Sequence, residues 1–206
     1  MTDVSIQPIQ RERVLIPIMG IAPLIVHNWS EKAKRQMLDA MQGKKKVREI
    51  KDPEADYQSS FYRTDTGFGF PALAFKDATV KGGGRLFGKN ARMTELRACL
   101  YVRGLPSADK TQLLTPIVGE PRLREDVVRV GINGTDLRYR GEFLEWSTLL
   151  DVTYVTTSLS LDSVLSLVDA GGMAIGVGEW RPEKSGQNGT YEIDRTREIE
   201  VMEATS

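Results

Sequence analysis

A glycine-rich stretch near the end of the chain has the residue types that contact a polyanion. In GVGEWRPEKSG (176–186), Gly176 and Gly178 permit close backbone approach or a positive φ. The stretch also carries one aromatic ring and two cations, on Trp180, Arg181 and Lys184. A dinucleotide-binding fold does not fit, because its glycine motif opens a helix and Pro182 interrupts one here. The stretch predicts either a loop that faces nucleic acid or a long hairpin whose tryptophan packs on the core.

Two earlier stretches concentrate cations. Residues 32–51 hold eight Lys or Arg against two acids, and Trp29 and Tyr57 flank them as possible stacking surfaces. GGRLFGKN (83–90) has the spacing of a phosphate loop, but Asn90 replaces the metal-binding Ser or Thr, so we expect a flexible basic loop. The expected phosphate contacts are Lys44, Lys45, Lys46, Arg48, Lys81, Arg85, Lys89 and Arg92. The alternative is that these charges are simply solvated.

Catalytic residue types are scarce. His27 is the only histidine and Cys99 the only cysteine, so the ligands for a zinc site are missing. We therefore expect no metal and no cofactor. His27 could act alone as a general base near a phosphate, or it could end a strand and bond to a backbone partner. A single cysteine allows no disulfide within the chain and favours a reducing cytoplasm.

Composition indicates a soluble globular protein of 206 residues, 40% hydrophobic and 27% charged, with no apolar run long enough to span a membrane. The net charge is zero but unevenly distributed. Residues 31–103 carry 16 Lys or Arg against 9 acids, whereas residues 104–206 carry 10 against 17. This asymmetry is typical either of a face that binds a polyanion or of copies that associate head to tail.

The hydrophobic pattern predicts alternating strands and helices. Strands are expected at 13–28 (with a bend), 67–71, 94–104, 113–118, 127–131, 137–140, 146–158 and 189–194. One helix is expected at 31–42, and a second begins after a cap at Asp52. A third runs from Pro71 to about Lys81 and ends at the three glycines 82–84. A fourth begins after a cap at Ser160 or Asp162. The order predicts an α+β fold with a ferredoxin-like β-α-β-β-α-β core. A single domain would place this core at about 13–42 and 94–195, with an inserted basic segment at about 43–93.

A glycine-rich loop between the last helix and the last strand of such a core resembles the RAMP superfamily, the RNA-binding backbone and processing proteins of CRISPR systems. APLIVHNWS (22–30) is similar to the turn after that family's first strand. The resemblance implies that the loop approaches RNA, and that His27 lies where processing members often carry a histidine. Glu179 and Glu183 depart from the pattern by diluting the positive charge of the loop. GEWRPEKSG also resembles a group of uncharacterised bacteriophage proteins.

Three functions follow as hypotheses. The first is a non-enzymatic protein with a RAMP-like or RRM-like core that binds single-stranded RNA or DNA in the cytoplasm, alone or as one protomer of a ring or filament. The second is a metal-independent endoribonuclease that uses His27. The third is a structural protein that assembles head to tail through its oppositely charged halves.

Overall fold

The computed structural model describes residues 8–28, 31–44, 50–130 and 134–202. Four of the residues expected to contact nucleic acid lie outside this part of the chain: Trp29, Lys45, Lys46 and Arg48. Within it, strands and helices both occur throughout, which confirms the expected mixture of helix and strand. None of the described helices is both long and apolar enough to cross a membrane.

The largest sheet is built around β1 (Arg11–Gly20). β1 pairs antiparallel with β10 (Ser147–Val155), with Ile16 opposite Leu150. The remaining strands are β5 (Leu100–Val102), β11 (Tyr191–Ile193) and β12 (Glu200–Met202). The order is β11-β1-β10-β5, and β12 also pairs with β1. Along β10, alternate side chains are buried, as a strand with one covered face requires.

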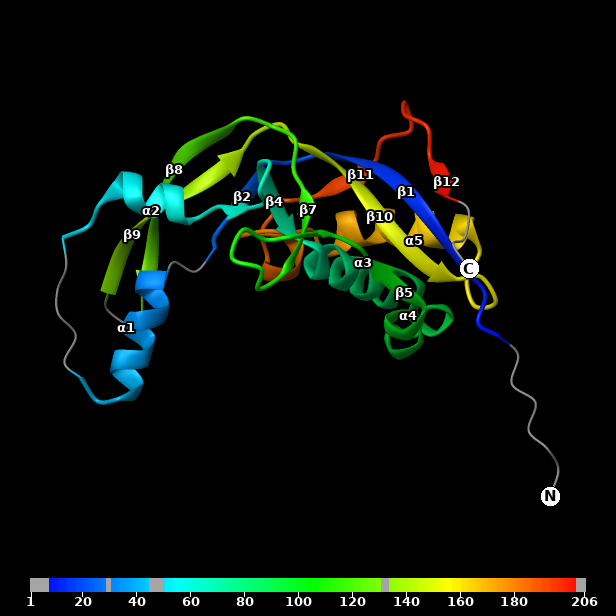
Figure 1. Ribbon diagram of the computed structural model, residues 1–206, viewed down its shortest axis with the longest axis horizontal. Coiled ribbons are helices and arrows are strands. Elements are labelled where there is room, and N and C mark those ends of the chain that lie inside the picture. The colour runs from blue at the N-terminus through cyan, green and yellow to red at the C-terminus, as the bar shows by residue number, and fades with distance from the viewer. Residues whose placement is uncertain (1–7, 29–30, 45–49, 131–133, 203–206) are drawn as a thin grey trace, which may run out of the picture.

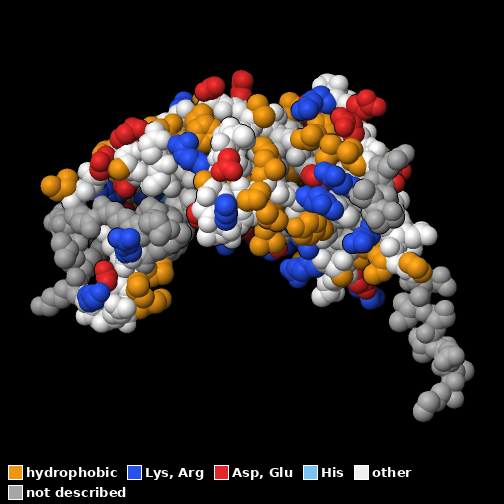
Figure 2. Space-filling view, viewed as in Figure 1, with side chains coloured by type: hydrophobic (Ala, Val, Ile, Leu, Met, Phe, Trp, Pro, Cys, Tyr) orange, Lys and Arg blue, Asp and Glu red, His pale blue; other side chains and the backbone are white. Residues whose placement is uncertain are grey.

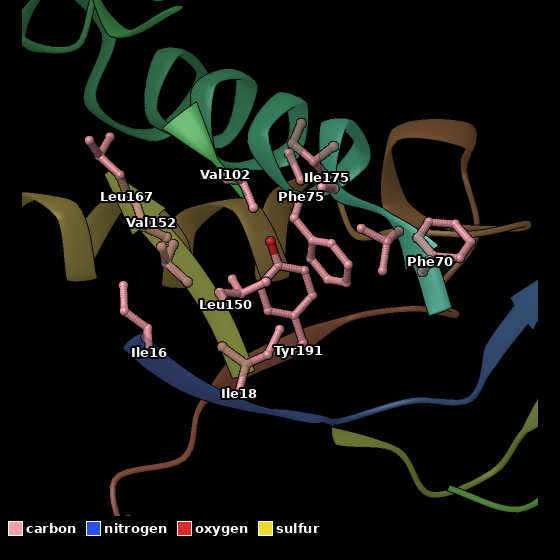
Figure 3. Packing of buried hydrophobic residues seen from close by; sticks show 14 of the residues in the cluster. Ile16, Ile18, Phe70, Phe75, Val102, Leu150, Val152, Leu167, Ile175 and Tyr191 are labelled. Atoms are coloured by element: carbon pink, nitrogen blue, oxygen red, sulfur yellow. The ribbon is translucent and has the colours of Figure 1, made fainter. Parts of the chain in front are cut away.

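Two helices, α3 (Ala72–Phe87) and α5 (Leu161–Ala174), cover one face of this sheet (Figure 1). The hydrophobic core lies between them and the strands (Figure 3). Phe75 of α3, Leu150 of β10 and Tyr191 of β11 are all buried there. Along the chain, the elements that enclose this core run strand, helix, strand, strand, helix, strand: β1, α3, β5, β10, α5 and β11.

The three glycines 82–84 do not end a helix, contrary to the sequence prediction. α3 continues through them because they lie where it crosses α5. A Cβ at Gly82 would come within 2.5 Å of backbone atoms of Ala170 and Gly171, and a Cβ at Gly171 would lie 2.7 Å from the backbone nitrogen of Thr79. Tertiary contact between the two helices therefore overrides the local tendency of glycine to stop a helix.

Two further expectations are corrected. The stretch 83–90 is the last turn of α3 and a short 3-10 helix, η1 (Gly88–Asn90), rather than a flexible loop. The first half of 94–104 is helical, in α4 (Met93–Cys99), and only its second half pairs as β5. Phe61, Phe70 and Phe75, from the segment 43–93, are part of the buried hydrophobic cluster.

A second group of strands forms the other end of an arch (Figure 1). A three-stranded sheet has the order β2-β9-β8, from β2 (Leu24–Val26), β9 (Gly134–Phe143) and β8 (Pro121–Val130). Helix α2 (Pro53–Ser59) packs on β9, and its N-terminus is capped by Asp52 as expected. Helix α1 (Glu31–Met41) lies at this same end, far from the largest sheet.

A small sheet connects the two ends, with the order β3-β4-β7-β6. Its strands are β3 (Tyr62–Arg63), β4 (Phe68–Pro71), β7 (Leu113–Pro116) and β6 (Leu105–Pro106). β4 leads directly into α3, so this sheet fixes where that helix begins. The remaining short element is the 3-10 helix η2 (Pro182–Lys184), inside the glycine-rich loop.

The contact between α3 and α5 predicts that a methyl group added at Gly82 lowers the stability of the fold. Gly82→Ala should lower the free energy of unfolding by about 1–3 kcal/mol in urea denaturation, because the new Cβ would overlap backbone atoms that cannot move aside cheaply. At an exposed position in a helix, the same Gly→Ala change would instead raise the free energy of unfolding by about 1 kcal/mol. Gly67→Ala is the control, since a Cβ at that exposed turn meets nothing within 4 Å. Equal stability of Gly82→Ala and wild type would contradict the proposed helix contact.

Candidate nucleic-acid interface

The glycine-rich loop between α5 and β11 is held on β2 by backbone hydrogen bonds. The amide of Glu179 donates to the carbonyl of Ile25 at 3.0 Å, and the amide of Gly189 donates to the carbonyl of Pro23 at 2.8 Å. Inside the loop, the amide of Val177 donates to the carbonyl of Gly189 at 2.9 Å. The loop is therefore an ordered part of the fold rather than a free hairpin.

Glycines are required where the loop approaches its own support. Gly178 has φ +79°, and a Cβ there would lie 2.6 Å from the carbonyl oxygen of Ile25. Gly189 has φ +64°, and a Cβ there would overlap the carbonyl oxygen of Val177. Gly176, at φ +67°, lies against the ring of Pro182. The close approach expected at Gly176 and Gly178 is thus made to the protein itself in this structure.

Trp180 is presented outward by this fixed backbone. It is one of three non-glycine residues with a positive φ among the described residues, at 56°, a conformation that a bulky side chain rarely adopts. The amide of Asn188 donates to its carbonyl at 3.1 Å, and 49% of the residue is exposed. An exposed aromatic ring on a strained but anchored backbone is typical of a contact residue.

Two of the expected cations, Lys81 and Arg181, meet at Glu183. Lys81 Nζ lies 2.7 Å from Glu183 Oε1, and Arg181 Nη2 lies 2.6 Å from Glu183 Oε2. Lys81 also pairs with Asp77 at 2.5 Å, and Arg181 donates to the carbonyl of Gly178. Hydrogen bonds from Lys81 and then Arg181 lower the pKa of Glu183 from an ordinary 4.5 to about 2. Asp77 and Glu183 together balance the charge of both cations, and the Lys81–Glu183 pair joins α3 to the loop.

A pocket of about 290 Å³ opens beside the loop. His27, Tyr62 and Glu179 contribute to its walls. His27 Nδ1 lies 3.6 Å from Glu179 Oε1, and the hydroxyl of Tyr62 donates to the carbonyl of His27 at 3.3 Å. The nearby His27 side chain lowers the pKa of Glu179, while burial and then the charge of Glu179 raise the pKa of Tyr62. No cluster of three or more metal-ligating side chains is found in the described ranges.

The other expected cations are dispersed. Arg85 donates to the carbonyl of Ala174, and Arg92 pairs with Glu95 near the start of α4. Lys44 pairs with Asp39 at the far end of the arch. The amines of Lys89 and Lys184 are exposed and form no ion pair within the described part of the chain. Figure 2 shows Lys and Arg scattered over one face among acidic side chains, so no single basic patch forms there.

Sequence reasoning missed an arginine-rich face on the β8–β9 hairpin. Arg122 and Arg124 both pair with Glu142, at 2.7 and 2.6 Å, and Arg124 lies opposite Arg140 in the ladder. Arg140 is 2% exposed, its Nη1 lies 3.4 Å from Asp126, and burial lowers its pKa. The alternation in RLRED (122–126) and LRYRGE (137–142) was the available signal, because alternate strand residues share a face.

The ion pairs of Glu183 predict a pH-dependent contribution to stability. A carboxylate with a lowered pKa in the folded state stabilises the fold above about pH 4.5, and this stabilisation is lost as the pH falls toward about 2. Glu183→Gln should therefore unfold at a lower urea concentration than wild type at pH 7, and the difference should shrink as the pH approaches 2. Glu192→Gln, on an exposed position of β11, is the matched control. A difference in urea midpoint between Glu183→Gln and wild type that stays the same from pH 7 to pH 2 would refute the role given to Glu183.

Comparison with known proteins gives only distant similarities. No protein-family model and no curated protein matches the chain. A chain in the cryo-EM structure of the Type III-B Cmr-beta bound to cognate target RNA aligns with 93% of this chain at 11% identity and a TM-score of 0.45, and this chain covers 61% of its length. The crystal structure of Cmr6 from Pyrococcus furiosus aligns with 90% of this chain and 100% of its own, at 11% identity and a TM-score of 0.43.

Proposed function

We propose that the protein binds single-stranded nucleic acid, RNA or DNA, along its glycine-rich loop. Trp180 is the observation that carries this proposal. Its backbone at φ 56° costs free energy, of order 1–3 kcal/mol, and its ring packs into no core cluster. Hydrogen bonds at Glu179 and Asn188 fix the backbone on both sides of this residue. A rigid exposed ring suits stacking on an unpaired base, since every base offers a flat face.

The charges around the loop support a limited electrostatic role. Lys184 on the loop and Lys89 beside α3 are exposed and available to phosphates, whereas Asp77 and Glu183 together neutralise Lys81 and Arg181. The basic segment that contains Lys44, Lys45, Lys46 and Arg48 would add further phosphate contacts. Binding would then depend on salt but less steeply than the number of cations in the sequence suggests.

The arrangement of the core supports a RAMP-like or RRM-like form. The chain order strand-helix-strand-strand-helix-strand, together with the sheet order β11-β1-β10-β5, supports a ferredoxin-like core in a single domain. In this core the first crossing helix is α3, so the insertion between β1 and α3 would carry α1, α2 and the basic segment. Association of copies along a strand, a cytoplasmic location, and a role in a CRISPR or bacteriophage system belong to the same proposal.

Trp180 variants separate its role in binding from its role in folding. Trp180→Gly should relieve the backbone strain and keep or raise stability, while it weakens binding to a fluorescent 20-nucleotide oligouridylate or oligothymidylate by about 5- to 100-fold. Trp180→Phe keeps a stacking ring and should bind more tightly than Trp180→Gly. Anisotropy titrations at low and moderate salt measure both effects. Undiminished binding by Trp180→Gly would remove the main support for the loop as the interface.

One observation favours a second function, a metal-independent endoribonuclease. His27 is the only histidine, and its imidazole faces the carboxylate of Glu179 in the pocket beside the same loop. A carboxylate orients an imidazole, which suits general acid-base transfer of a proton to or from an RNA hydroxyl. The endoribonuclease hypothesis predicts that wild-type protein cuts labelled RNA in the presence of EDTA and that His27→Ala leaves the RNA intact. Intact RNA after long incubation with wild type would leave binding alone as the function.

A further inference from the structure

Besides the glycine-rich loop, four separate parts of the chain bound the pocket. The start of α3 contributes Asp77, β3 contributes Tyr62, β4 contributes Phe70, and His27 follows directly after β2. The loop itself closes the remaining side. Its volume of about 290 Å³ is at the small end of the range for ligand pockets, about 300–1,000 Å³, and suits one planar ring system rather than a dinucleotide.

The charges that line the pocket exclude a phosphate as its occupant. Three carboxylates line it, on Asp77, Glu179 and Glu183. Lys81 pairs with both Asp77 and Glu183, and Arg181 pairs with Glu183 as well. The third carboxylate, Glu179, pairs with His27 at 3.6 Å, and the charges of Arg140 and Arg138 also act on it. The pocket therefore offers a hydrogen-bond acceptor and favours a ligand with N–H donors.

Aromatic and aliphatic side chains form part of the walls around this acceptor. Tyr62 and Phe70 meet edge to face, with ring centroids 5.5 Å apart. Ile175 and Val177 line the pocket from the side of α5 and the loop. Apolar and aromatic walls around a few fixed polar groups are how proteins hold a single base that has left its stack.

We infer that the pocket receives one base of the bound strand and that Glu179 selects guanine. Guanine is the nucleobase whose N1–H and N2–H donors lie side by side on the Watson–Crick edge, so both oxygens of one carboxylate can accept from it. Adenine and cytosine offer one amino group there, and uracil offers one N–H between two acceptors that a carboxylate repels. Glu179 would thus be a specificity residue, and it precedes Trp180 directly, so consecutive residues would contact neighbouring nucleotides.

This inference rests on the proposed binding of single strands, so the experiment has two arms. In the first arm, full-length protein is titrated with GMP, AMP, CMP and UMP by isothermal calorimetry. In the second, anisotropy compares a 20-nucleotide oligouridylate with the same strand carrying one central guanine or one central adenine. Glu179→Gln replaces one acceptor with a donor at equal size. Glu120→Gln, on the exposed turn before β8, is the matched control.

We expect GMP to bind about tenfold more tightly than the other three nucleotides, and the strand with guanine to bind about tenfold more tightly than the strand with adenine. Glu179→Gln should abolish both preferences, while Glu120→Gln should keep both and leave the affinity for oligouridylate unchanged. Equal binding of all four nucleotides, or a preference for guanine that survives in Glu179→Gln, would overturn the inference.

Binding of N-acetylarginine amide in place of GMP would overturn it too, because the pocket would then fit a protein side chain. Selective GMP binding without strand binding would support the pocket and refute the proposed function.

Discussion

The position of the glycine-rich loop on β2 is the constraint on which the rest of the site depends. Two amides of the loop, at residues 179 and 189, donate to carbonyls of the segment that follows β1. Gly178 has no room for a side chain against Ile25, and Gly189 has none against Val177 inside the loop. Because this backbone is fixed, Trp180 faces solvent while Glu179, the residue before it, lines the pocket. The glycines thus determine where the functional side chains point.

Ion pairing changes what the cations of the loop can do. Arg181 and Lys81 look like phosphate contacts in the sequence, but both are held by Glu183, whose lowered pKa reflects those two partners. The two glutamates that seemed to dilute the charge of the loop therefore have separate roles. Glu183 fastens the loop to α3, and Glu179 remains as an acceptor in the pocket. This division favours recognition of a base over recognition of a phosphate at the centre of the interface.

Local signals in the sequence predicted local structure well. The caps at Asp52 and Ser160 are confirmed, and the β-branched alternation of 146–158 appears as β10. The glycines 82–84 were misassigned because their role depends on Gly171, almost ninety residues away, which no local pattern reveals. The arginines of β8 and β9 were missed because strand pairing, not sequence spacing, brings them to Glu142. Likewise the sequence identified Trp180 as a candidate but could not show that Glu183 neutralises its neighbour Arg181.

Photo-crosslinking tests the central claim, that a single strand lies along the glycine-rich loop, most directly. A 20-nucleotide strand that carries 4-thiouridine, or 4-thiothymidine for DNA, is crosslinked to the full-length protein, and the modified peptides are mapped by mass spectrometry. The account predicts adducts at Trp180 or elsewhere in residues 176–189 that an excess of unlabelled strand removes. Adducts confined to other parts of the chain, or no competable adduct at all, would contradict it.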